Sequence, residues 1–229
     1  MQVLLDYLLI WDHTRAVVLR PGIPDRLLWK WTNDQTFTTA SAYRAFFIGQ
    51  YSVLGAKTLS KTRAPGKCRF FGWLALHDRC WTAARRKRHN LQDDDTCAFC
   101  CQESETITHL LVGCSFSREV WFAALQSMGW QSLAPPSNSF SLADWWASAR
   151  KCLLKDDRRK LDSIIILVSW ILWLERNKRV FDRQARSAQQ LLSLIADEAV
   201  QWGLAGYTQV EALAVALGRR PGRTLTFVT

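Results

Sequence analysis

The spacing of apolar residues near the N-terminus predicts two short strands. Leu27 to Trp31 form a strand-like run, and Phe37 to Thr39 suit a second strand beyond a turn at residues 32–34. Ser41 or Thr39 can then cap a helix that runs through Tyr43, Phe46 and Phe47, because a side-chain oxygen there accepts a hydrogen bond from a free backbone N–H. We therefore expect a small β-hairpin that leads into a helix.

The middle of the chain is predicted to be helical beyond a loop. Residues 49–64 lack a clear period and are expected to form that loop. A helix with Pro65 in its first turn then carries apolar residues from Phe70 to Leu76, and a short basic helix runs from Thr82 to about Arg88. Apolar residues recur at helical spacing again from Val120 to Met128, with Ser115 or Ser117 as the cap.

The C-terminal part is also predicted to be helical, with helices over residues 142–155, 157–181, 188–202 and 209–217. The second of these is apolar on nearly all sides from Ile164 to Leu174, so we expect it to be buried. That run is too short to cross a bilayer, which takes about 20 apolar residues. Glu175 and Arg179 lie one turn apart and can form an ion pair.

These elements predict a mainly α protein with a small β-hairpin near the N-terminus. The chain has 229 residues and 48% hydrophobic content, enough to bury a sizeable core. The Pro- and Ser-rich stretch at 134–140 predicts a linker. It separates a domain over residues 1–133 from a helical C-terminal region over 141–218, and a basic tail follows over 219–229.

The net charge of +10 is concentrated in one segment. Ten basic residues and the single acid Asp78 lie between Lys57 and Asn90, which leaves the rest of the chain nearly neutral. Such a segment favours a polyanionic partner, either nucleic acid or an anionic membrane surface. The N-terminus contains Asp6 and lacks a positive leader and a small-residue cleavage site, so we expect an intracellular and more specifically nuclear protein.

Seven cysteines in a reducing compartment indicate metal binding more than disulfides. Cys97, Cys100, His109 and Cys114 follow the pattern C-x2-C-x8-H-x4-C, which supplies three thiolates and one imidazole for tetrahedral zinc. A left-handed Gly113 is expected to turn Cys114 back toward the metal. Four protein ligands leave no position for water, so the one Zn²⁺ ion would be structural and not hydrolytic.

Two alternatives to this ligand set remain open. The cysteines can be buried small hydrophobic residues with His109 as a hydrogen-bonded core histidine. Cys101 can also replace Cys100, which changes the first pair to C-x3-C. The other three cysteines have no ligand partners nearby in sequence and are expected to be core thiols: Cys68, Cys80 and Cys152.

Several further motifs follow one another in a distinctive order. They are Asp25-Arg26-Leu27-Leu28-Trp29, Phe37 to Tyr43, Pro65 to Leu76, and the Cys/His cluster with Glu105. This series resembles a known family, the zinc-binding domain of reverse transcriptases in plant LINE-type, non-LTR retrotransposons. The resemblance runs from about Asp25 to Trp121, and a later segment at 170–181 resembles the region C-terminal to that domain in such polyproteins.

The resemblance implies a zinc-stabilised accessory module that binds nucleic acid, with Cys97, Cys100, His109 and Cys114 as its ligands. The chain is then a fragment of a retroelement reading frame or a gene derived from one. The sequence contains neither a motif with the paired carboxylates of a polymerase palm nor one with the inward-facing acids of ribonuclease H, so we expect no enzyme. The expected partners are DNA or RNA and the rest of a retroelement polyprotein, with no membrane and no small-molecule substrate.

Phosphate contacts are assigned to the basic residues Lys67, Arg69, Arg85, Arg86, Lys87 and Arg88. A run such as Arg85 to Arg88 can instead be a nuclear localisation signal or a solvated helix face. The competing hypothesis for the whole chain is a protein-interaction module, or an inactive retroelement remnant with a purely structural zinc site. A zinc hydrolase is disfavoured by the four protein ligands.

Overall fold

The computed structural model describes residues 2–15, 22, 28–45, 55–136 and 141–219. Contacts divide the chain into two units, residues 1–51 and residues 52–229. The predicted linker at 134–140 lies partly outside the described residues, and the predicted tail lies outside them apart from Arg219. Both of the regions that the predicted linker joins contribute to the second unit.

The first unit contains two helices and no strand among its described residues. Helix α1 spans Gln2–Arg15 and helix α2 spans Thr39–Ala45. Between them, the Trp29 backbone N–H donates to the Gln35 carbonyl at 3.0 Å, and the Trp29 and Phe37 rings meet edge to face at 5.0 Å. Leu27, Phe46 and Phe47, which the predicted elements include, lie outside the described residues.

The predicted β-hairpin is therefore wrong, and local side-chain hydrogen bonds explain why. The Asp34 carboxylate accepts bonds from the backbone N–H and the hydroxyl of Thr36, and the Thr32 hydroxyl donates to the Thr36 carbonyl. Short polar side chains of this kind satisfy backbone groups within a turn and compete with strand pairing. Across the described parts of both units, the only β pairing is an isolated antiparallel bridge between Thr96 and Ser104.

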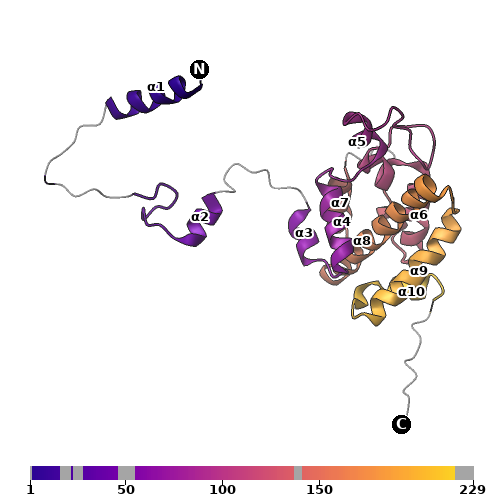
Figure 1. Ribbon diagram of the computed structural model, residues 1–229. Helices are drawn as coiled ribbons and strands as arrows, with labels where there is room; N and C mark the ends of the chain where they lie inside the picture. The colour runs from indigo at the N-terminus through magenta and orange to yellow at the C-terminus, as the bar shows by residue number, and fades with distance from the viewer. Residues whose placement is uncertain (1, 16–21, 23–27, 46–54, 137–140, 220–229) are drawn as a thin grey trace, which may run out of the picture. The chain divides into compact units, whose positions relative to one another are not determined.

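The second unit is built from helices that pack around α8 (Figure 1). Their bounds are α3 (Ala56–Lys61), α4 (Gly66–Leu76), α5 (Ala83–Arg88), η1 (His109–Gly113), α6 (Ser115–Ser127), η2 (Gln131–Leu133), α7 (Leu142–Lys151), α8 (Lys155–Asn177), η3 (Lys178–Asp182), α9 (Ala188–Leu204), η4 (Thr208–Val210) and α10 (Glu211–Ala216). Helix α3 lies in the segment that was expected to be a loop. The expectation is wrong for Ala56–Lys61, because one buried residue, Leu59, is enough to anchor this short helix against the core, while residues 49–54 lie outside the described residues.

The core lies around the apolar middle of α8, whose residues from Ile164 to Val168 are buried as the sequence predicts. Helix α4 crosses α8 closely at Gly72, where an added Cβ would lie 2.8 Å from a methyl carbon of Ile166. The predicted ion pair is confirmed, with Arg179 Nε 2.9 Å from Glu175 Oε1. Among the described residues, no helix combines the length and apolar character needed to span a bilayer.

Candidate metal centre

The first two candidate ligands lie on a tight turn that the backbone holds closed. The Thr96–Ser104 bridge begins this segment, which we call the Cys/His loop and define as residues 96–114. The Cys97 N–H donates to the Glu103 carbonyl at 2.8 Å, and the Cys101 N–H donates back to the Cys97 carbonyl at 2.9 Å. Cys97 is buried, whereas Cys101 is exposed at a left-handed position with φ of 54°.

The other two candidate ligands flank the π-helical turn η1. The Cys114 N–H donates to the His109 carbonyl at 2.7 Å, five residues back. Because a π turn is wider than an α turn, residues five apart lie nearly one above the other. The expected left-handed Gly113 is wrong, since Gly113 is absent from the positive-φ residues of the described chain. The wide turn itself returns Cys114 to the side of His109.

The four candidate ligand atoms come together, all within 4.8 Å of one another. Cys97 Sγ lies 4.0 Å from Cys114 Sγ, and Cys100 Sγ lies 3.4 Å from His109 Nε2. Tetrahedral zinc with bonds of about 2.3 Å to sulfur and about 2.0 Å to nitrogen holds two thiolates about 3.8 Å apart and a thiolate and an imidazole nitrogen about 3.6 Å apart. The donor set and these two separations therefore fit a zinc ion, and the widest separation in the cluster, up to 4.8 Å, has to shorten when all four atoms bind one ion.

Hydrogen bonds among the candidate ligands shift the pKa values of their side chains. A hydrogen bond to Cys114 is the main reason that the pKa of Cys97 rises to about 12, and the same bond lowers the pKa of Cys114. The pKa of His109 rises to about 9, chiefly through its hydrogen bond to Cys97. A metal ion that takes these ligands must displace their protons, so metal uptake and proton release are coupled.

Glu103 orients the histidine and was not identified from the sequence. Its Oε2 lies 3.1 Å from His109 Nδ1, on the opposite side of the ring from the nitrogen that faces the thiols. A carboxylate in this position fixes which nitrogen carries the hydrogen and makes the other a better metal ligand. No regular spacing marks such a residue, because the carboxylate contacts the ligand and not the metal.

Glu105 connects the Cys/His loop to two helices. Its Oε1 accepts bonds from the Ala83 N–H at 2.7 Å and from Arg176 Nη2 at 2.7 Å, and its Oε2 accepts from the Ala98 N–H at 3.3 Å. Both side chains of the Glu105–Arg176 pair are at most 3% exposed. The loop, the start of α5 and the end of α8 are thus joined through one carboxylate. The sequence drew attention to Glu105 only through the family resemblance.

The basic residues of α5 are partly engaged with neighbouring acids and carbonyls. Lys87 pairs with Asp95 at 2.8 Å and Arg88 with Asp78 at 3.3 Å, while Arg85 donates to the Asp78 carbonyl and lies over the Trp81 ring. On α4, Lys67 and Arg69 are both exposed, and Lys67 Nζ lies 5.8 Å from the centre of the Trp170 ring. The six candidate phosphate contacts thus belong to two consecutive helices of one unit.

The remaining cysteines differ in their surroundings. Cys68 and Cys80 are buried as expected, and burial raises the pKa of each thiol to about 12. Cys152 is exposed at the end of α7, so its assignment as a core thiol is wrong. At the end of a helix, the direction of a side chain depends on how the chain turns beyond the helix. The spacing of apolar residues within the helix does not predict that turn.

The Cys/His loop lies in a region that is similar to known proteins. Residues 37–121 match the family model described as zinc-binding in reverse transcriptase. The matched zinc-binding region starts before α2 and ends in α6, and it includes the whole Cys/His loop. The chain is also 23% identical over 191 residues to an Arabidopsis thaliana protein with the provisional name ribonuclease H protein.

The two chains are matched to different extents. The alignment covers 71% of this chain but only 31% of the Arabidopsis protein, so the chain spans about a third of the length of that curated relative. No solved structure matches the chain. The family match and the cluster of Cys97, Cys100, His109 and Cys114 support a zinc-binding region of the reverse-transcriptase type in a protein with a retroelement-like plant relative.

Proposed function

We propose that the chain is a structural zinc-binding and nucleic-acid-binding accessory region, derived from a non-LTR, LINE-type retrotransposon polyprotein of a plant and without polymerase activity of its own. The observation that carries the proposal is the cluster of Cys97, Cys100, His109 and Cys114, whose two measured ligand separations suit zinc. One ion bound by all four residues has a closed shell. The zinc supplies cross-linking there, and this chain's own residues supply the contacts to a partner.

The closed shell has a structural consequence for the rest of the unit. Ala98 lies between the first two ligands, and its N–H donates to Glu105, which also accepts from Ala83 and Arg176. Fixing the ligands therefore fixes the position of Glu105 and, through it, the start of α5. We propose that the zinc holds α5 at a set angle on the unit, so that its cations are presented to phosphates in a fixed arrangement.

The nucleic-acid part of the proposal assigns phosphate contacts to Lys67, Arg69 and the α5 residues Arg85 to Arg88. Contacts of this kind bind DNA and RNA without reading bases. A basic cluster of this composition also suits a nuclear location. The Arabidopsis relative's name, a ribonuclease H protein, agrees with a partner that is a nucleic acid.

A second candidate function is a protein-interaction module. Phe70 and Trp73 on α4 are 62% and 44% exposed and stack on each other with ring centres 6.2 Å apart. Exposed aromatic side chains are common at protein interfaces. This surface can contact another part of a polyprotein and leave the zinc site with a purely structural role.

A salt titration of the full chain separates the two candidates. A nucleic acid bound through phosphates loses affinity linearly in a log–log plot, with a slope of roughly 0.7 to 0.9 per phosphate contact. The measurement is the dissociation constant for DNA and RNA oligonucleotides of unrelated sequence, before and after Arg85, Arg86, Lys87 and Arg88 are changed to glutamine. Similar losses for all sequences and a smaller slope support the proposal. An unchanged slope, with zinc content and thermal melting intact, favours the interaction module.

A further inference from the structure

A second basic cluster draws its residues from segments on both sides of α5 in the sequence and is assembled only by folding. The end of α3 and the short linker to α4 contribute Lys61 and Arg63, and the Ser163 hydroxyl donates to the Arg63 carbonyl at 2.8 Å, which fastens this linker to α8. The two segments are about one hundred residues apart in sequence. Their junction encloses a cavity of about 510 Å³, which we call the basic cavity.

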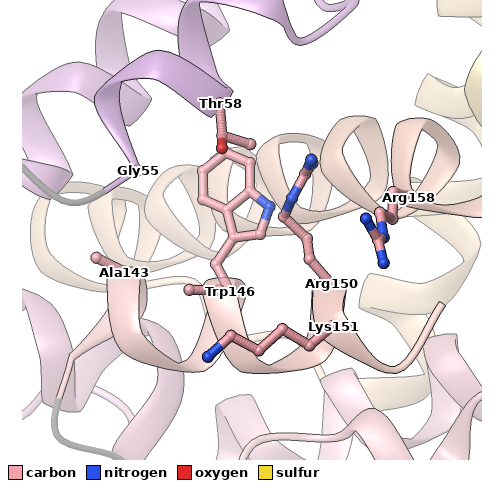
Figure 2. A pocket seen from close by; sticks show the side chains of 8 residues that line it. Gly55, Thr58, Ala143, Trp146, Arg150, Lys151 and Arg158 are labelled. Atoms are coloured by element: carbon pink, nitrogen blue, oxygen red, sulfur yellow. The ribbon is translucent and has the colours of Figure 1, made fainter. Parts of the chain in front are cut away.

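Six cations line the basic cavity: Lys61, Arg63, Arg150, Lys155, Arg158 and Arg159. The one carboxylate in its lining is Asp162, which is occupied by Arg150 and by the indole N–H of Trp146 at 2.7 Å. Figure 2 shows a smaller neighbouring pocket that shares Arg150 and Arg158 with the basic cavity and is also lined by Lys151. With Asp162 paired to Arg150, five positive charges remain in the lining, and one of them, Arg159, also contacts Asp156 at the surface.

Three cations at this site have no ion-pair partner in the described part of the chain, unlike Lys87 and Arg88 of α5. Among the described residues, Lys61, Arg63 and Lys155 have no ion-pair partner, and all three are exposed. Arg159 has only a surface contact with Asp156 at 3.7 Å. Like charges gathered in a concave surface raise the local positive potential and concentrate anions. An anion with several oxygens relieves that repulsion and can accept several charge-assisted hydrogen bonds.

Two polar features make the cavity more than a collection of surface charges. Helix α8 begins at Lys155 without a side-chain cap, so its first backbone N–H groups lie near the cations, in a turn that also carries Asp156 and Asp157. Gln209, which also lines the cavity, has a buried side-chain oxygen without a hydrogen-bond partner among the described residues. Its amide can present an NH2 group to an anion when turned about its last bond.

We propose that the basic cavity binds phosphate groups, and that these belong to the backbone of a nucleic acid. The phosphate chemistry follows from the cavity, whereas the nucleic-acid source rests on the function proposed above. A free polyphosphate is the other source of the same chemistry. Along α8, Asp162 and Arg176 are fourteen positions apart, which is about 21 Å, so the cavity and the α5 region are separate sites that can be removed one at a time.

The test removes one cation from each wall of the cavity in the full chain, as the double variant Arg63→Gln with Lys155→Gln. Loss of a cation from the first turn of α8 should not weaken that helix, because its N-terminal end is positive. The matched control is Lys178→Gln with Arg183→Gln, which removes the same charge from η3 and its end, away from the cavity lining. Zinc content and thermal melting confirm that each variant folds.

The ligands are a single-stranded DNA of about twenty nucleotides and inorganic pyrophosphate. For the DNA, two lost contacts lower affinity roughly ten-fold or more at about 0.1 M salt and reduce the salt slope by about 1.4. The control changes affinity by less than about three-fold, because charges beyond about 10 Å are screened at this salt concentration. Pyrophosphate should bind the parent and the control, with competition by the DNA, and should lose binding in the cavity variant.

The outcomes separate this inference from the proposed function. A cavity variant that binds both ligands as the parent does overturns the inference, whatever the α5 variant does. A cavity variant that loses pyrophosphate but binds DNA normally keeps the phosphate site and overturns its nucleic-acid source. If DNA binding falls in the cavity variant and is unchanged in the α5 variant, the inference stands and the assignment of contacts to α5 fails.

Discussion

The Cys/His loop and the helical core hold their residues in place by different means. From Thr96 to Thr106 the only buried residues are Cys97 and Glu105, and the apolar residues Phe99 and Cys100 pack against the core while only partly buried. In α8, by contrast, consecutive aliphatic residues from Ile164 to Val168 are buried. A segment with so little apolar burial needs another source of stability, which metal ligation and a buried ion pair can supply. The core needs neither.

Removing the candidate metal ligand Cys97 should have the largest effect. We expect Cys97→Ser to abolish metal retention, because three ligands no longer complete the tetrahedral shell. Backbone N–H groups of residues 96–106 should then lose protection from hydrogen exchange, while those of α8 keep it. Elemental analysis and exchange measured by mass spectrometry check this. Acid should release metal from the parent chain in the same way, because protonated thiols do not bind zinc.

The outcome that contradicts this comparison is a loop that stays protected after metal loss. In that case the hydrogen bonds of Cys97 and Cys101, together with Glu105, suffice to hold the turn, and the zinc is an addition to a formed structure. Global unfolding on metal loss also contradicts the comparison, because the helical core would then depend on the ion for its stability.

Neutralising Glu105 should be the next largest change. Glu105→Gln leaves the Arg176 guanidinium buried with a weaker partner, and breaking a buried ion pair in this way typically costs about 3 to 5 kcal/mol. Unfolding in denaturant measures the loss. The control is Glu119→Gln on α6, which removes an exposed carboxylate and should change stability by less than about 0.5 kcal/mol. Equal effects of the two variants would remove Glu105 from its role as the link between loop and core.

Crowding the contact between α4 and α8 should affect the core alone. A methyl group at Gly72 would lie 2.8 Å from Ile166 and 3.0 Å from Leu59, and such overpacking typically costs about 1 to 3 kcal/mol. Gly66→Ala is the matched control, because nothing lies within 4 Å of an added Cβ there. Thermal melting should fall for Gly72→Ala only, with metal content unchanged in both. A loss of metal in Gly72→Ala would show that the core and the metal site are not independent.

Removing the Glu103 carboxylate should act on the metal alone. Glu103→Ala leaves the His109 ring without the partner of its Nδ1 atom, and losses of this kind lower metal affinity about 10-fold to 100-fold. Competition with a chromophoric chelator measures the affinity. The stability of the metal-free chain should stay within about 0.5 kcal/mol, because the Glu103 side chain is 72% exposed.

The same contrast explains which features could be predicted from the sequence. Residues 97–114 bring all four candidate ligands together within a short segment, so their spacing already indicated a cluster. The burial of the apolar run in α8 could also be predicted from the sequence, because its apolar residues are consecutive. The β-hairpin failed because Thr32, Asp34 and Thr36 form local hydrogen bonds that hydrophobic spacing does not register.

Features that join distant segments were not predictable in this way. The basic cavity combines Arg63 with Lys155 and Arg159. In the sequence, residues 155–162 look nearly neutral, because Asp156, Asp157 and Asp162 lie among the basic residues there. The fold then paired Asp162 with Arg150 and left the cavity positive. The π turn at η1 was missed for a similar reason, because the turn that returns Cys114 to His109 depends on packing of Leu110 and Leu111 in the core.

Replacing Cys101 should have the smallest effect of all. Cys101 is adjacent to Cys100, but it is exposed and lies outside the cluster of ligand atoms. Its contribution to the turn is its backbone N–H, which donates to the Cys97 carbonyl and which serine retains. We therefore expect Cys101→Ser to keep the metal with unchanged affinity, whereas Cys100→Ser should lose it. If elemental analysis gave the reverse result, the turn would have to shift by one residue to a C-x3-C arrangement, and the hydrogen bond from Cys101 to Cys97 would have to break.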